Sequence, residues 1–323
     1  MARFVFPAQP ARLGAPAGAA AAGRPVAGIA WMLLAATCVT LVGVLVKGLG
    51  ARLPAAEIAS LRAWLMIAVL IPWLAWRAPA AFRVRAPGLL AVRALLLTAI
   101  NGLGFWVLTV LPLVLVTAIA FAKPLFVTVL AAVFLSERVR LRRGLATLLG
   151  FVGVLITLNP SQLTGVEAGM LAAAGAVLVT VCMASSVIIG KQLTLSEDPV
   201  TIVVWSNLCV AVLLGLPAAL LWVPPTAQEW ALLALLAALG FISQQAFLRA
   251  YRAAEAGFVA PFEYVRILMA AAAGWLWFAE VPGWEIAAGA PLIIASGLYI
   301  AHRETRLAKE KALERAKGIE PSS

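Results

Sequence analysis

Long apolar stretches alternate with short polar breaks along the whole chain. The stretches are about 20 residues long, which is what an α-helix needs to cross the roughly 30 Å hydrocarbon core of a bilayer. A membrane-spanning β-strand is about half as long and alternates apolar with polar side chains, which this pattern does not do. We therefore predict an all-α integral membrane protein. About ten transmembrane helices are expected, near residues 26–46, 57–76, 88–108, 113–135, 143–158, 168–190, 199–223, 229–248, 258–279 and 284–301.

The least obvious division falls within residues 88–135, where the apolar stretch is nearly continuous. The segment Leu111-Pro112-Leu113 is the plausible turn there, because a helix usually ends at or before the residue that precedes a proline. Dividing the stretch at this turn gives two helices. The orientation of every later helix depends on that division.

The composition excludes a water-soluble domain. Hydrophobic residues make up 63% of the chain, charged residues 12%, and the mean hydropathy is +1.01, far from the values of soluble domains. Cys38, Cys182 and Cys209 fall at unrelated positions inside predicted helices, so neither a disulfide framework nor a zinc site is indicated. No metal and no other cofactor is expected.

The net charge of +11 would suit a nucleic-acid partner, but the distribution of the bases has a topological explanation. Most of the 25 Lys and Arg residues lie in the N-terminal arm, in alternate loops and in the C-terminal tail, whereas Lys47 and Arg52 lie on the opposite side. The positive-inside rule then makes both termini cytoplasmic. We expect a disordered cytoplasmic arm at 1–25, a charged cytoplasmic tail at 302–323 and no nucleic-acid partner.

The chain also contains a weak internal repeat. Laying residues 117–137 over 260–280 gives poor identity but aligns the unusual residues. The aligned pairs are Phe121 with Tyr264, Lys123 with Arg266, and Glu137 with Glu280. Each half, 26–158 and 168–301, then holds five helices, and an odd number of helices gives the halves opposite orientations. Such inverted repeats are typical of secondary transporters, which bind substrate near the bilayer midplane.

Lys123 lies near the middle of a predicted helix, where a lysine costs roughly 3 kcal/mol. Arg266 occupies the equivalent place in the second half, and Glu263 shares its helical face. Two bases and one acid make a net positive site that attracts a carboxylate or phosphate. One hypothesis is that Lys123 holds the anionic group of a substrate while Glu263 and Arg266 form a gate. The alternative is that Glu263 pairs with the bases and the cluster only fixes helix packing.

Three rings, two amides and two prolines complete the candidate site. The rings are able to stack on a substrate ring or a sulfonium, the amides can bond a substrate or a neighbouring helix, and the prolines interrupt backbone hydrogen bonding and are candidate hinges. These residues are Trp106, Phe121, Tyr264, Asn101, Gln244, Pro124 and Pro261. Arg62, near the outer end of its helix, is able to reach the interface by snorkelling, and a role in binding substrate is the less favoured alternative.

Three segments carry a family resemblance. PLFVTVLAAVFLSERVRLRRGLATLLGFVGVLITLNP, AYRAAEAGFVAPFEYVRILMAAAAGWLWFAE and GKQLTLSEDPVTIVVWSNL resemble the EamA family of the drug/metabolite transporter superfamily. The resemblance covers about residues 26–303 and implies ten helices in two inverted five-helix repeats, with alternating access to a central site. APFEYVRI is most similar to the branch of S-adenosylmethionine uptake transporters. Lys123 departs from the small or hydroxyl residue usual in the family before that proline.

The function predicted from these features is secondary transport of a small organic metabolite that carries a carboxylate, such as an amino acid derivative or S-adenosylmethionine, across the bacterial inner membrane. An anion-selective channel and a lipid-translocating protein are the alternatives. An enzyme is not expected, because His302 and Asp198 are the only His and Asp residues and both lie outside the predicted helices. The expected partners are the substrate and the lipid bilayer, and a homodimer is an open alternative to a monomer. Import, export and proton coupling are left open.

Overall fold

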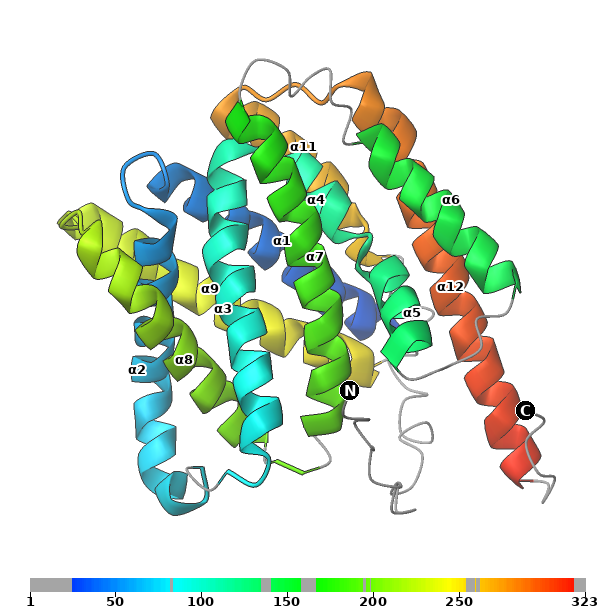
Figure 1. Cartoon of the computed structure of the whole chain (residues 1–323), viewed down its shortest axis with the longest axis horizontal. Coiled ribbons are helices and arrows are strands. Elements are labelled where there is room, and N and C mark those ends of the chain that lie inside the picture. The colour runs from blue at the N-terminus through cyan, green and yellow to red at the C-terminus, as the bar shows by residue number, and fades with distance from the viewer. Residues whose placement is uncertain are drawn as a thin grey trace, which may run out of the picture.

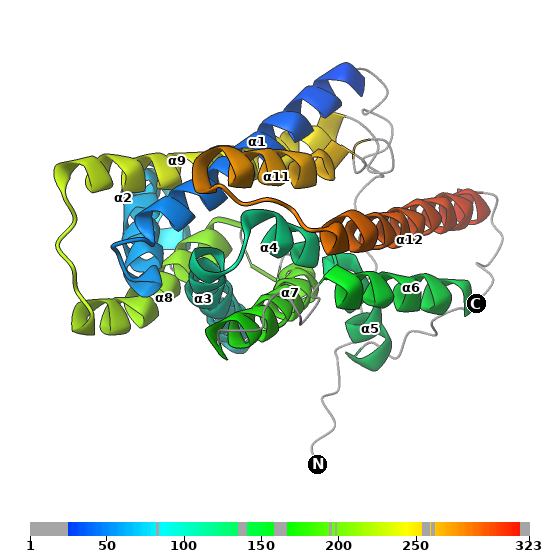
Figure 2. The ribbon, with the colours of Figure 1, turned by 90° about the horizontal axis from the view of Figure 1, so that it is seen from above.

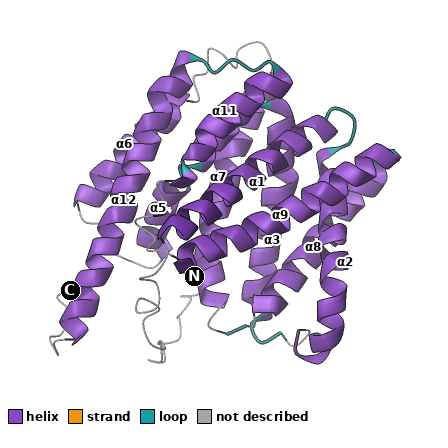
Figure 3. Cartoon of the chain, turned by 180° about the vertical axis from the view of Figure 1, so that it is seen from behind, coloured by secondary structure: helices purple, strands orange, loops and turns teal. Residues whose placement is uncertain are grey.

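The computed structural model describes residues 25–81, 84–134, 141–157, 167–193, 196–197, 199–253, 259 and 262–316. All regular secondary structure in these ranges is helical (Figure 1, Figure 3). The helices are α1 (Pro25–Leu49), α2 (Ala55–Ala81), α3 (Pro87–Val110), α4 (Leu113–Ala120), α5 (Lys123–Phe134), α6 (Leu141–Thr157), α7 (Glu167–Leu193), α8 (Pro199–Leu220), α9 (Ala227–Ala253), α11 (Val265–Phe278) and α12 (Trp284–Ala316).

The predicted all-α membrane class is confirmed. Among the described residues, six helices are long and apolar enough to cross a membrane, and three shorter apolar helices accompany them. Each of the ten predicted spans coincides with helical structure, 57–76 being part of α2. The apolar part of α12, Trp284–Ile300, agrees with the predicted span 284–301, and the helix continues to Ala316 through much of the charged tail. The arm at 1–24 and residues 317–323 lie outside the described part of the chain.

The span predicted over 113–135 is divided into α4 and α5, next to Pro124, the residue expected to interrupt its backbone hydrogen bonding. Phe121 and Ala122 form a turn between α4 and α5. Pro124 has no N–H to donate to Ala120, and the amide of Leu125 donates to Ala122 at 2.9 Å. This tighter bond replaces the regular helical ladder at the junction. Proline is tolerated in the first turn of α5 because amide groups there have no helical partner.

A second interruption lies at Tyr264, which is in a turn before α11. The helical residues 262–263 precede this turn, and the amide of Ile267 donates to Tyr264 at 3.0 Å. Both interruptions therefore fall at positions that the weak sequence repeat aligns with each other.

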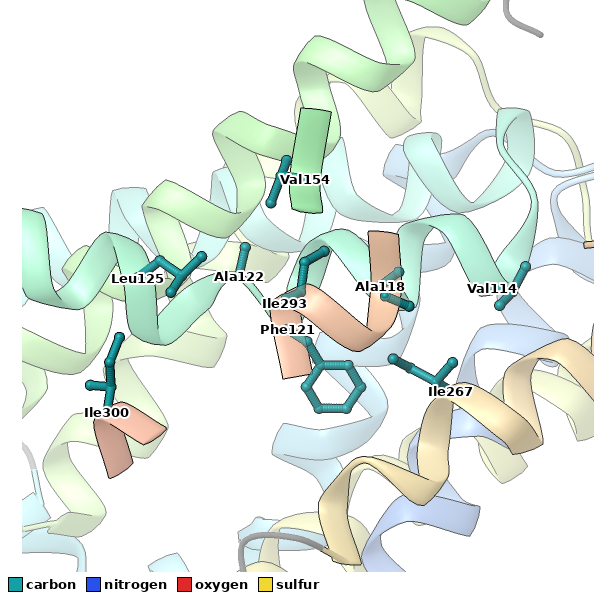
Figure 4. Packing of buried hydrophobic residues seen from close by; sticks show 10 residues of the cluster. Val114, Ala118, Phe121, Ala122, Leu125, Val154, Ile267, Ile293 and Ile300 are labelled. Atoms are coloured by element: carbon teal, nitrogen blue, oxygen red, sulfur yellow. The ribbon is translucent and has the colours of Figure 1, made fainter. Parts of the chain in front are cut away.

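The helices pack in long pairs. α1 lies along α9, α2 along α8, α3 along α7 and α6 along α12 (Figure 2). α4 is central, since it contacts α11, α7, α6 and α12. Figure 4 shows buried side chains filling the space around the α4–α5 turn. They include Phe121, Ala122 and Leu125, together with Val154 of α6, Ile267 of α11 and Ile293 of α12.

Small residues allow α6 and α12 to approach closely. A Cβ added at Gly289 would lie 2.6 Å from the carbonyl oxygen of Gly153 and 2.1 Å from Oγ1 of Thr157. A Cβ at Gly153 would lie 2.9 Å from the carbonyl oxygen of Gly289. Without a hydrophobic driving force between helices in lipid, such backbone approach supplies the van der Waals contact that holds the pair together.

Gly289→Ala is expected to destabilise the protein by about 1–3 kcal/mol, because the rigid backbone of α6 has to move away. Thermal unfolding of detergent-purified protein measures the change. Gly48→Ala is the matched control, since a Cβ at Gly48 meets nothing within 4 Å, and alanine is the better helix former. Equal unfolding temperatures for the two variants would contradict the proposed packing constraint.

Candidate functional site

Three predicted site residues come together where the two interrupted helices meet. The rings of Phe121 and Tyr264 lie with their centroids 4.7 Å apart at an interplanar angle of 36°. The guanidinium carbon of Arg266 lies 4.5 Å from the centroid of the Phe121 ring, a distance at which a cation is attracted by the face of an aromatic ring. The α4–α5 turn and the start of α11 are thus joined by one aromatic–cation cluster.

Arg266 has little polar compensation in this cluster. Its Nε is buried and has no hydrogen-bond partner. Glu263 lies within electrostatic range of Arg266 and of Tyr264. However, the two ion pairs found among the described residues do not include Glu263 with Arg266. The close pairing considered from their spacing is therefore not part of this structure, and the charge of Arg266 faces mainly the Phe121 ring.

Lys123 is the first residue of α5 and directly follows the α4–α5 turn. Its side chain is partly exposed, and within the described ranges no hydrogen bond or ion pair is recorded for its ammonium group. Pro124 follows in the first turn of α5, where it contributes to the interruption. The second hinge candidate, Pro261, lies outside the described residues, as does Glu137, which the repeat aligns with Glu280.

The position of Tyr264 depends on a glycine of α12. A Cβ added at Gly297 would lie 2.5 Å from the Tyr264 hydroxyl oxygen. The glycine therefore makes room for the phenol, and α12 supports the ring that stacks on Phe121.

The other candidates are more widely distributed. Trp106 packs with the hydrophobic cluster between α3 and α7 that includes Val107 and Ile119. Gln244 is exposed on α9. Asn101 of α3 accepts a hydrogen bond from Arg62 of α2. Arg62 thus turns toward the bundle interior, which corrects the expectation that it snorkels to the interface.

An ion-pair network at the end of the bundle escaped the sequence analysis. Lys47 Nζ lies 2.5 Å from Glu280 Oε1 and donates to the carbonyl of Leu111 at 2.7 Å. The other carboxylate oxygen, Oε2, accepts the amide of Leu113 at 2.8 Å. One carboxylate therefore ties the end of α11 to the end of α1 and to the α3–α4 turn. The sequence does contain a signal for this pair, because Lys47 and Glu280 directly follow two predicted spans that end on the same side of the membrane.

The backbone at the end of α11 directs Glu280 into this network. Ala279 has φ 53°, in the left-handed region that turns the chain back on itself. The amide of Glu280 donates to Gly274 at 3.0 Å. A Cβ at Gly274 would lie 2.7 Å from Glu280 Oε2, so the glycine leaves space for the carboxylate.

A second ion pair joins the α1–α2 link to the start of α9. Arg52 bonds the carboxylate of Glu229 through Nε and Nη2. The same carboxylate accepts the amide and hydroxyl of Thr226, while the amide of Glu229 donates to Thr226 Oγ1, which is a capping box. The hydrogen bonds to Glu229 raise the pKa of Arg52 above its ordinary value.

Within the described part of the chain, no group of three or more His, Cys, Asp or Glu side chains lies close enough to hold a metal ion. The central cluster of Phe121, Tyr264 and Arg266 offers aromatic faces and one cation, and Lys123 begins the neighbouring α5.

Comparison with known proteins gives consistent results. The EamA-like transporter family matches residues 26–159 and again residues 170–301. The chain is 31% identical over 286 residues to an S-adenosylmethionine uptake transporter of Rickettsia bellii, covering 88% of this chain and 96% of the relative. It is 32% identical over 294 residues to a riboflavin transporter of Rhizobium johnstonii, covering 90% and 95%. A protein of known crystal structure shares the fold with a TM-score of 0.58 at 17% identity, over 86% of this chain and 97% of that one.

Removing one partner of the Lys47–Glu280 pair is expected to destabilise the protein, because the side chains are only 13% and 14% exposed. Glu280→Gln is expected to cost on the order of 3 kcal/mol. Lys47→Met is expected to cost less, because Glu280 keeps the amide of Leu113. Thermal unfolding of both variants and of the double variant measures the coupling. Additive effects would contradict a direct interaction.

Proposed function

This chain belongs to the EamA-like transporter family, and we propose that it is a secondary transporter that moves a small organic metabolite with an anionic group by alternating access. The family and the named relatives make the chain a multi-pass membrane transporter and not an enzyme.

One observation carries the choice of site: the contact of Phe121 with Tyr264 and Arg266 where two helices are interrupted. Transporters commonly bind substrate at such interruptions, where the N-terminal end of a half-helix favours an anionic group. α5 begins at Lys123, and Arg266 lies in the first turn of α11. Each half-helix thus adds a basic side chain to its own positive end.

Several features support an inverted repeat. The family matches the two halves separately. In an inverted repeat, α1, α2, α3 and α6 of the first half correspond to α7, α8, α9 and α12 of the second. The pair α1–α9 then corresponds to the pair α7–α3, and the pairs α2–α8 and α6–α12 correspond to themselves. Two such halves rocking around a fixed central site would give alternating access.

Two sets of hydrogen bonds from backbone amides to carboxylates are also related by this correspondence between the halves. Glu57 of α2 accepts the amide of Val223, in the α8–α9 link, at 3.1 Å. Glu197 of the α7–α8 link accepts the amides of Arg85 and Ala86, just before α3, at 2.5 Å each. A carboxylate of each half therefore holds the corresponding link of the other half.

The Lys47–Glu280 network supplies a candidate closure on one side. Under the positive-inside rule, both termini are cytoplasmic and this network lies on the outer side. The proposal then assigns the structure an outward-closed arrangement in a bacterial inner membrane. Opening toward the outside would separate α11 from α1 and from the α3–α4 turn, which the Glu280 carboxylate now links.

The chemistry of the cluster favours an anionic metabolite with a ring or a cationic centre. Lys123 and Arg266 would hold a carboxylate, while Phe121 and Tyr264 offer faces for a ring or a sulfonium, and Trp106, from the neighbouring hydrophobic cluster, is a further candidate face. Asn101, Gln244 and Glu263 are proposed polar contacts, and Pro124 a hinge. S-adenosylmethionine, named for one group of relatives, combines these groups. Riboflavin, named for another, has the ring without the carboxylate and is the second candidate.

Lys123→Ala is expected to abolish binding of a carboxylated ligand and to leave the protein folded, because it removes a cation that has no hydrogen bond or ion pair with the described residues. The measurement is thermal unfolding with S-adenosylmethionine, S-adenosylhomocysteine, riboflavin, amino acids and nucleosides. A ligand at 100 times its Kd should stabilise the wild type by about 2.7 kcal/mol.

The control for this test is Arg306→Ala, which removes an exposed base of α12 outside the proposed site and should keep the full ligand shift. A shift that persists in Lys123→Ala would place the site elsewhere. Loss of folding in that variant would favour the hypothesis that Lys123 only fixes helix packing.

A further inference from the structure

We propose that Arg62 forms a second oxyanion-binding position, between α2, α3 and α9, that recognises a carboxylate or phosphate. The proposal rests on the transport function inferred above and adds a residue that is not part of the site proposed there. The same chemistry has two sources: the anionic group of the substrate, which Arg62 would bind at a different stage of transport from Lys123 and Arg266, or a free anion that accompanies the substrate.

The first argument is the position of the guanidinium. Arg62 Nη2 donates to Asn101 Oδ1 at 2.5 Å, and its guanidinium carbon lies 5.5 Å from the centroid of the Phe105 ring. Asn101 lies well inside α3, which runs from Pro87 to Val110. The charge of Arg62 is therefore carried into the bundle, although Arg62 itself starts near one end of α2.

The second argument is that this charge has no acidic partner. The ion pairs of the described residues join Lys47 to Glu280 and Arg52 to Glu229, and neither includes Arg62. Its Nε is buried without a hydrogen-bond partner. Placing a cation inside the bundle with only a neutral amide and an aromatic ring as neighbours costs free energy of folding. An anion that binds there during transport would supply the missing compensation.

Asn101 orients the guanidinium without neutralising it. Its Nδ2 donates to the carbonyl of Leu97 at 2.7 Å, which leaves Oδ1 as the acceptor for Arg62. This amide orientation is fixed because Arg62 can only donate and a carbonyl can only accept. Asn101 engages Nη2 alone, so Nε and Nη1 keep N–H groups that can each donate to an oxygen of an anion.

The third argument is the space beside the charge. A Cβ added at Gly240 of α9 would lie 3.4 Å from Arg62 Nη1. That is an ordinary van der Waals distance, so the glycine leaves this flank of Nη1 without a side chain and a larger residue would cover it. Arg62 accordingly retains partial exposure although its Nε is buried.

Arg93 offers a matched comparison. It is also a partly buried arginine with an unpaired Nε, but its Nη1 donates to the carbonyl of Ser186 at 2.9 Å. A Cβ at Gly190 would lie only 2.1 Å from that Nη1, so the guanidinium closes directly over α7 near its C-terminal end. The negative end of the α7 dipole compensates this charge, and we expect no ligand there.

The test compares S-adenosylmethionine with its decarboxylated analogue, which keeps the sulfonium and the adenosine. Binding to detergent-purified protein is measured by thermal shift and calorimetry. The wild type is expected to prefer the carboxylated ligand, and Arg62→Gln is expected to lower this preference about 10- to 100-fold, as loss of a charge-assisted hydrogen bond predicts. Arg93→Gln is expected to keep the preference.

Two further variants keep the test decisive if Arg62→Gln fails to fold. Asn101→Ala retains the cation but releases its orientation, and Gly240→Leu fills the space beside Nη1. Both are expected to reduce the preference for the carboxylated ligand by at least about fivefold, and Gly240→Leu is expected to leave the affinity for the decarboxylated analogue within about twofold. A purely structural role would change both affinities together.

Titration with sodium acetate and with inorganic phosphate separates the two sources of the anion. Stabilisation by these salts that disappears in Arg62→Gln but persists in Arg93→Gln supports a free anion at Arg62. A preference for the carboxylated ligand that Arg62→Gln retains, together with unchanged salt effects, overturns the inference and leaves the transport proposal standing. A wild type that binds no library ligand and responds to neither salt overturns both.

Discussion

The interior of this bundle is governed by the cost of placing charge in a medium that solvates it poorly. Lys47 is compensated by Glu280, and Arg52, at the start of the α1–α2 link, by Glu229. Arg266 instead lies over the Phe121 ring, and Arg62 is bonded to a neutral amide. The two ion-paired bases therefore lie at the ends of helices, whereas Arg62 and Arg266, which have no ion pair among the described residues, lie inside the bundle. In a transporter, this division separates groups that hold helices together from groups that can receive a substrate.

Helix interruption and close packing follow from the same constraint. Every backbone polar group inside a membrane has to be satisfied or face a polar site. The chain interrupts its helices at Phe121–Ala122 and at Tyr264, where side chains from other helices surround the turn. Gly297 makes room for the Tyr264 hydroxyl, and glycines bring α6 and α12 together nearby. The small residues thus position the aromatic faces of the central cluster as well as the helices that support them.

The sequence is sufficient for the membrane class and for the approximate position of each helix, because apolar runs of bilayer length carry that information directly. It also identifies Phe121, Tyr264 and Arg266, through the repeat and through the cost of a charge inside a span. Pro124 signals an interruption there, but the sequence does not place the turn at Phe121–Ala122, since a proline in an apolar run is also compatible with a kinked continuous helix. The partner of Arg62 and the Lys47–Glu280 pair depend on which helices become neighbours, and that information is long-range. Side-chain reach misled the interpretation of Arg62, which is long enough to extend inward as well as outward.

The central claim is that the two halves alternate around one site that binds an anionic metabolite. Counterflow in liposomes that contain the purified protein and no ATP tests it most directly. External labelled S-adenosylmethionine should enter by a saturable process, and internal unlabelled S-adenosylmethionine should accelerate its entry, because a loaded carrier returns to the outside by exchange. The same assay with riboflavin addresses the second candidate. Flux of either compound that rises linearly with concentration and is insensitive to the internal pool would contradict alternating access and favour a channel.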